Sequence, residues 1–145
     1  FTTVFMTNSF DVDVIDAKEA WARLVADEHT VLVDVRTMVE WAYVGVPDLR
    51  VLGKDVVTIE WTKMTGQQNA GFVRQLSQAV PDMDKPLLFI CRAGLRSHAA
   101  AIAARQAGYN NVVNISDGFD GELNDQGQRK SISGWCAQGL PWTQN

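Results

Sequence analysis

The stretch FICRAGLRSHAAAIAARQAGY, residues 89–109, decides how this chain folds. The apolar run at 87–90 leads directly into Cys91, and the alanine-rich segment at 97–107 has high helix propensity. Gly108 stands where a helix is expected to end, because glycine readily adopts the left-handed conformation that closes a helix. The stretch therefore predicts a buried strand, a short loop that begins with a cysteine, and a helix.

Strands and helices alternate on both sides of this stretch. The β-branched run at 30–35 and the apolar run at 111–115 each predict another buried strand, and the alternating pattern at 10–15 predicts a short one. A weakly marked strand is expected near Val56 and Val57. This order predicts an α/β domain with a mainly parallel five-stranded sheet and helices on both faces.

Two capping-box patterns mark the starts of helices. In such a pattern an Asp or Thr side chain and a Glu three residues later bond each other's backbone N–H groups. The two pairs are Asp16 with Glu19 and Thr37 with Glu40. Further helices are expected at 70–80 and, as a short last helix, at 117–123, while the segment 45–47 is expected to begin a loop.

The length of 145 residues fits one domain, and 46% hydrophobic with 21% charged residues is typical of soluble globular proteins. We expect a single domain over residues 10–145 and an N-terminal extension at 1–9. The segment 124–145 is expected to wrap irregularly over the domain, because it holds too many apolar residues for a free tail: Trp135, Leu140 and Trp142.

Charge and composition exclude several classes of function. A net charge of −4 does not attract nucleic acid or an anionic membrane. No apolar run approaches the roughly 20 residues that span a bilayer, and the first residues do not form an intact signal peptide. We therefore expect a cytoplasmic protein, and a periplasmic origin stays open because the chain does not begin with Met.

Metal binding is not expected either. The two cysteines stand 45 positions apart, there is no CxxC pair, and the two histidines, His29 and His98, are isolated. No metal ion and no organic cofactor are implied.

The loop after Cys91 has the features of an anion cradle. In open α/β sheets ligands bind at the carboxyl ends of the strands, and the following helix presents free N–H groups and partial positive charge. Backbone N–H groups of residues 92–96 can form a nest, which Gly94 permits by adopting a positive φ. Arg92 and Arg96 add permanent charge. These surroundings favour a reactive thiolate over a structural cysteine.

Four segments resemble conserved blocks of the rhodanese family. CRAGLRS (91–97) resembles the active-site loop, in which four residues separate cysteine from arginine. VLVDVRTMVEWAYVGVPD (31–48) is similar to the first block, although Val46 departs from the usual His-Ile-Pro, and NVVNISDGFDGE (111–122) is similar to the block after the active-site helix. GWCAQGLPWTQ (134–144) resembles the closing segment of bacterial single-domain members.

This resemblance implies a rhodanese-like fold and a thiosulfate sulfurtransferase. Cys91 would carry a sulfane sulfur as a persulfide, taken from a small anionic donor and passed to cyanide, a thiol or a persulfide-exchanging protein. Arg96 is the first choice for binding the donor. The persulfide would be held by the loop residues Arg92, Ala93, Gly94, Leu95, Arg96 and Ser97.

Other residues near this loop receive supporting roles or none. Asp34 and Arg36 either orient the loop through an ion pair or only close the first strand–helix connection, and Glu40 is a cap residue within possible reach of the loop arginine. His98 is not needed as a base, because an ionised thiol needs none. Cys136 is interpreted as a packed, inert thiol, with a resolving thiol or a disulfide partner as the alternatives.

Two other functions stay open. Cysteine-dependent phosphatases and arsenate reductase-like enzymes have a similar loop with five residues between cysteine and arginine, whereas this chain has four. The domain is alternatively a persulfide-carrying binding or sensor module. The natural donor, the acceptor and the oligomeric state do not follow from the sequence.

Overall fold

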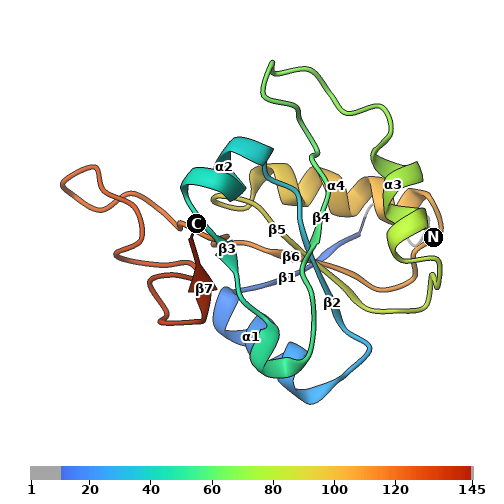
Figure 1. Cartoon of the computed structure of the whole chain (residues 1–145), viewed down its shortest axis with the longest axis horizontal. Helices are drawn as coiled ribbons and strands as arrows, with labels where there is room; N and C mark the ends of the chain where they lie inside the picture. Colours follow the sequence, from blue (N-terminus) through green and yellow to red (C-terminus); the bar gives the residue numbers. More distant parts are fainter. Residues whose placement is uncertain (1–10, 145) are drawn as a thin grey trace, which may run out of the picture.

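The computed structural model describes residues 11–144, so the extension expected at 1–9 lies outside the described part. Five parallel strands form the central sheet in the order β1-β6-β5-β2-β4, which confirms the predicted parallel five-stranded sheet (Figure 1). Their bounds are β1 Asp13–Ile15, β2 Val31–Asp34, β4 Val57–Thr58, β5 Leu87–Ile90 and β6 Val112–Ile115.

Helices cover both faces of this sheet, as the alternating sequence predicted (Figure 1). The helix α3 (Phe72–Ala79) and the helix α4 (Leu95–Gln106) contribute side chains to a core on one face, and α1 (Ala17–Ala26) contributes to the core on the other. The short helix α2 (Met38–Tyr43) buries no residue, and the 3-10 turn η2 (Arg50–Leu52) follows it.

The small side chains of α4 determine how closely it approaches the sheet. Ala100, Ala101 and Ala104 are fully buried in the same cluster as Phe89 of β5. Without side chains beyond Cβ, the helix axis lies close to the strands, and the first turn of α4 comes near the end of β5. This packing places the start of the helix beside Cys91.

Three segments differ from the expectation. The helix α4 begins at Leu95 rather than at residue 97, because Gly94 takes a φ of 104° and turns the chain directly into it. Residues 117–120 form turns and 121–123 have no regular structure, instead of the expected helix, since Gly118 and Gly121 have positive φ values. The segment expected as a loop at 45–47 contains the strand β3 (Val46–Pro47).

The strand β3 pairs antiparallel with β7 (Trp142–Thr143). The C-terminal tail, residues 124–144, is therefore irregular apart from β7. Trp135 is fully buried, and its indole N–H donates to the carbonyl of Pro141 at 2.6 Å. The carboxylate of Asp117 accepts the N–H groups of Ala17 and Gly134, at 2.8 and 3.0 Å. The tail is therefore tied to the start of α1 and to the turn after β6.

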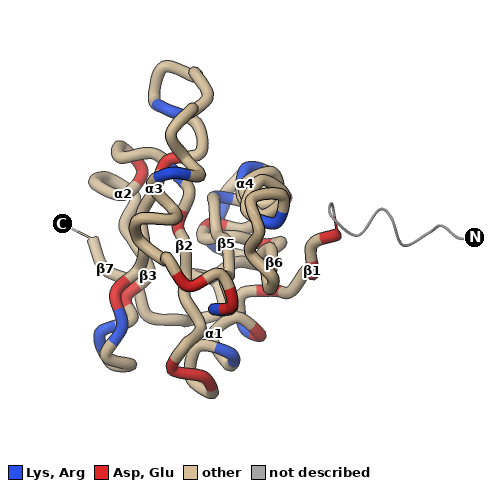
Figure 2. Tube along the Cα trace, turned by 90° about the vertical axis from the view of Figure 1, so that its right-hand side faces the viewer, with Lys and Arg blue, Asp and Glu red and all other residues tan. Residues whose placement is uncertain are grey.

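Acidic and basic residues are spread over the surface, and Figure 2 places Lys and Arg on and beside α4. No helix within residues 11–144 has the length and apolarity needed to cross a bilayer.

Candidate active site

Cys91 lies at the carboxyl edge of the sheet, directly after β5, whose last residue Ile90 pairs with Asp34 of β2. The first turn of α4 begins four residues later, at Leu95. The strand end, the loop and the helix start therefore meet at one point, as the parallel topology requires. Cys91 itself is buried, with 1% of its surface exposed.

Within residues 11–144, two groups form hydrogen bonds with the sulfur of Cys91. The backbone N–H of Gly94 donates to Sγ at 3.1 Å, and the Ser97 hydroxyl lies 3.2 Å from it. Among the described loop amides, that of Gly94 is the one that donates to Sγ. Fewer backbone N–H groups therefore bond the sulfur than the sequence predicted. Of the two groups at the sulfur, one comes from the loop and the other from the first turn of α4, and the Gly94 N–H is the donor of the pair whose direction is fixed.

Gly94 is required at its position in the loop. Its φ of 104° is unfavourable for other residues, and a Cβ atom there would stand 2.3 Å from the carbonyl oxygen of Ser116. The loop therefore passes so close to the end of β6 that only a glycine fits.

Asn114 completes the surroundings of the sulfur and was not identified from the sequence. It lies in β6, paired with Phe89 of β5, and is almost fully buried. Its Oδ1 accepts the Ser97 hydroxyl at 2.6 Å, and its Nδ2 donates to the carbonyl of Gly94 at 3.1 Å. A signal existed in the sequence, because a polar residue inside the buried run NVVNI needs a partner.

Arg96 is paired with Glu40 through two hydrogen bonds, of 2.7 and 2.9 Å. The carboxylate also accepts the N–H and the hydroxyl of Thr37, which completes the predicted capping box of α2. Burial alone would raise the pKa of Glu40, but the bonds from Arg96 and Thr37 outweigh it and lower the pKa to about 2. The ion pair also raises the pKa of Arg96. Much of the charge of Arg96 is thus neutralised by a neighbour.

Arg92, Ala93 and Leu95 form the exposed side of the loop. The backbone of the loop is held from behind by the turn after β6. The N–H of Phe119 donates to the carbonyl of Cys91 at 2.8 Å, and the N–H of Asp120 donates to that of Arg92 at 3.0 Å. This second support comes from the segment that was expected to be a helix.

Asp34 and Arg36 form an ion pair with both side chains fully buried, at 2.7 Å. The guanidinium of Arg36 also donates to the carbonyl of Gly45 at 2.7 Å and lies over the ring of Phe119, 4.3 Å from its centroid. The pair reaches the cysteine loop through Phe119, whose N–H holds Cys91. Its position therefore suits a supporting role.

A hollow of about 480 Å³ lies next to Arg96. Its walls come from the start of α2, the segment after β4 and α4, with Thr37, Val39, Thr62, Lys63, Met64, Gly66 and Arg96 as lining residues. Arg96 and Lys63 are the two basic residues of this wall, and Val39 and Met64 are exposed apolar ones. The hollow offers both positive charge and apolar surface near the loop.

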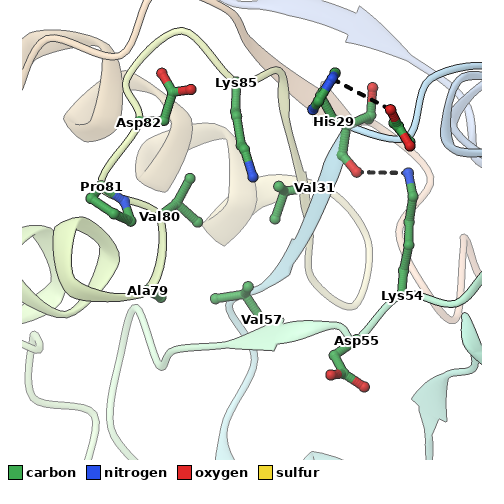
Figure 3. A pocket seen from close by; sticks show the side chains of 12 residues that line it. His29, Val31, Lys54, Asp55, Val57, Ala79, Val80, Pro81, Asp82 and Lys85 are labelled. Atoms are coloured by element: carbon green, nitrogen blue, oxygen red, sulfur yellow. Dashed lines mark hydrogen bonds and ion pairs between the residues drawn. The ribbon is translucent and has the colours of Figure 1, made fainter.

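A second hollow, of about 260 Å³, lies at the opposite end of the sheet, where β2 begins with Val31 (Figure 3). Lys54 stands in its wall, and its amine donates to the carbonyl of Thr30 at 2.9 Å and to two further backbone carbonyls. The lining contains no residue of the cysteine loop. This hollow is separate from the candidate site.

Neither His98 nor Cys136 makes a hydrogen bond to Sγ in the part of the chain that the structure describes. His98 is exposed on α4. Cys91 and Cys136 are both free thiols, and burial raises the pKa of Cys136 to about 11. Cys136 is partly buried, and this raised pKa keeps it protonated at neutral pH. Within the described residues, no three His, Cys, Asp or Glu side chains gather closely enough to hold a metal ion.

Comparison with known proteins places this geometry in a family. The profile of the STR4 middle domain matches residues 12–145. The crystal structure of Rv0390 from M. tuberculosis superposes with a TM-score of 0.87 at 42% identity, over 92% of this chain and 98% of that one. Uncharacterized protein RC0915 of Rickettsia conorii is 36% identical over 90% of this chain and 97% of its own length.

A protein of Allochromatium vinosum named sulfurtransferase is 27% identical over 90% of this chain and 94% of its own length. Other relatives, from plants, carry rhodanese-like in their names. The chain therefore belongs to the rhodanese-like family, in the group described by the STR4 middle domain.

Proposed function

We propose that this chain is a sulfurtransferase that carries a sulfane sulfur on Cys91, with thiosulfate or a similar small anion as the donor. The observation that carries the proposal is the position of the Cys91 sulfur. It lies at the carboxyl end of a parallel strand, next to a helix start, and accepts the Gly94 N–H at 3.1 Å. The name of the Allochromatium vinosum relative supports the same reaction class.

The reaction consists of two displacements at sulfur. The Cys91 thiolate attacks the outer sulfur of thiosulfate, a new S–S bond forms, and the old one breaks as sulfite leaves with its electron pair. A nucleophile such as cyanide or a thiolate then attacks the outer sulfur of the persulfide. The electron pair of that S–S bond returns to Cys91 as thiolate. No oxidant or reductant is consumed, and no general base is needed once the thiol is ionised.

The surroundings of the loop favour a small anionic donor. Four residues separate Cys91 from Arg96, whereas cysteine-dependent phosphatases have five, and the shorter loop suits a smaller group than a phosphate ester. The exposed Arg92 and the basic residues of the hollow next to Arg96 supply positive charge near the loop. Since Glu40 neutralises much of Arg96, we assign donor binding to Arg92 and Lys63 together with Arg96 rather than to Arg96 alone. Gly94 and Ser97 hold the inner sulfur.

Two exposed apolar side chains lie at the loop and in the hollow beside it. Leu95 is 85% exposed at the start of α4, and Met64 is 65% exposed in the wall of the hollow beside Arg96. Exposed apolar side chains around a reactive centre suit contact with another protein. We therefore include a persulfide-exchanging protein thiol among the acceptors.

Intact-protein mass spectrometry after incubation with thiosulfate tests this function. The unmodified chain is expected to gain the mass of one sulfur atom, and cyanide is expected to remove it as thiocyanate. Cys91→Ser is expected to abolish the gain, whereas Cys136→Ser is the matched control and is expected to retain it. A gain that persists in Cys91→Ser would refute the assignment. Hydrolysis of a phosphomonoester that depends on Cys91 would instead favour the phosphatase alternative.

A further inference from the structure

Cys91 and three neighbouring residues form a closed ring of hydrogen bonds. The ring runs from Cys91 Sγ to the Ser97 hydroxyl at 3.2 Å, and from there to Asn114 Oδ1 at 2.6 Å. It continues from Asn114 Nδ2 to the Gly94 carbonyl at 3.1 Å, and the Gly94 N–H closes it on Sγ at 3.1 Å. Cys91, Gly94, Ser97 and Asn114 are all buried, so water does not substitute for these bonds.

The orientation of the Asn114 carboxamide is set by its neighbours. The carbonyl of Gly94 can only accept a hydrogen bond, so it requires the NH₂ end of the carboxamide. The Oδ1 end then faces the Ser97 hydroxyl and can only accept from it. The carboxamide therefore cannot be reversed without placing two oxygens against each other.

The Ser97 hydroxyl has a single proton and two acceptors within reach, Asn114 Oδ1 and, once ionised, Cys91 Sγ. We propose that Asn114 is a positioning residue that draws the Ser97 proton away from the sulfur and thereby controls the charge state and reactivity of Cys91. With the proton on the Asn114 side, the oxygen of Ser97 turns its lone pairs to the sulfur and accepts the thiol S–H.

This role fits both steps of sulfur transfer, the loading of Cys91 and the release of the sulfur to an acceptor. It rests on the sulfurtransferase function proposed above. In the free thiolate, Asn114 weakens the bond from Ser97 and leaves the sulfur more nucleophilic. In the persulfide the negative charge lies on the outer sulfur, so Sγ needs no donor and Ser97 bonds fully to Asn114. Asn114 thus favours loading of the cysteine over the resting thiolate.

Other charged groups act on the sulfur in addition to this ring. Arg96 of α4 lies close enough to interact electrostatically with Cys91 and is itself paired with Glu40 of α2. The buried pair of Asp34 and Arg36 lies at the end of β2, and Arg92 is in the loop itself. None of these residues is changed by a substitution at Asn114, so its effect can be measured against a constant background.

The test is a titration of the Cys91 thiolate by its ultraviolet absorbance. The same titration of Cys91→Ser is subtracted, because it contains the absorbance changes of Cys136 and the tyrosines. Asn114→Leu frees the Ser97 proton for the sulfur and is expected to lower the titration midpoint by about 0.5 to 1 pH unit, the effect of one hydrogen bond. In a Ser97→Ala background the same change is expected to leave the midpoint where it is. An unchanged midpoint, or an equal fall in both backgrounds, would overturn the proposal.

Asn114→Asp covers the case in which Asn114→Leu does not fold. The carboxylate retains the acceptor for Ser97 and is expected to raise the midpoint, with part of the rise lost in the Ser97→Ala background. A rise of the same size in both backgrounds would contradict the role of Ser97. The titration needs no sulfur donor, so it gives an answer even if the chain transfers no sulfur.

Discussion

The ion pair between Glu40 and Arg96 is expected to stabilise the folded protein, and the structure gives the size of this contribution to the free energy of unfolding. The substitution Glu40→Gln removes the charge while preserving the size of the side chain. Glu40 has a pKa lowered from 4.5 to about 2, and its side chain is 20% exposed. At about 1.4 kcal/mol per pH unit this difference corresponds to about 3 kcal/mol of stability at neutral pH.

The variant is expected to lose somewhat less than this amount, about 2 kcal/mol, because glutamine retains one acceptor for Arg96. The sign of the pH dependence follows from the lowered pKa. The stabilisation is complete above the unfolded value of 4.5 and is lost as the pH falls through the folded value of about 2. The difference between the two proteins is therefore expected to shrink by more than half at about pH 3.

Urea unfolding at about pH 7 and about pH 3 measures both quantities. Glu19→Gln is the matched control, because Glu19 pairs with Arg23 on the exposed side of α1, with side chains 52% and 42% exposed. It is expected to cost under about 0.5 kcal/mol. If Glu40→Gln and Glu19→Gln cost the same, or if the cost of Glu40→Gln does not fall with pH, the pairing does not stabilise the loop as argued.

Two further substitutions test the supports of the cysteine loop. Asp34→Asn leaves the buried guanidinium of Arg36 without its counter-charge and is expected to cost about 3 to 5 kcal/mol in urea unfolding. Asp48→Asn breaks a pair of the same spacing whose arginine, Arg50, is 79% exposed, and it is expected to cost clearly less because that guanidinium stays hydrated. Equal effects would contradict the burial argument. Gly118→Ala would place a Cβ 2.5 Å from the carbonyl of Arg92 and is expected to cost over about 3 kcal/mol, against about 1 kcal/mol for Gly53→Ala, where the Cβ meets open space. A similar loss for both would show that the loop yields to accommodate the methyl group.

The sequence alone determined the strands of the central sheet, the main helices and the place of the cysteine. The apolar run before Cys91, the alanine-rich segment after it, and the capping box of Thr37 and Glu40 are patterns between near neighbours. Their periodicity and backbone preferences do not depend on the rest of the fold, so they predicted the parallel sheet and the helices on both faces. The segment 117–123 was misjudged because its two left-handed glycines pack against distant segments, Gly118 against the backbone of Cys91 and Arg92 and Gly121 against Ser133.

Only the tertiary structure decided which side chains meet at the sulfur. Glu40 and Arg96 are 56 positions apart, and Ser97 and Asn114 are 17 apart. Whether such groups pair depends on how helices and strands pack, and no local pattern encodes those distances. The strand β7 also depends on packing, because Trp142 and Thr143 form a strand by pairing with β3, which is distant in the sequence. A local sequence specifies its own backbone, whereas the charge and hydrogen bonding at Cys91 arise from segments that packing brings together.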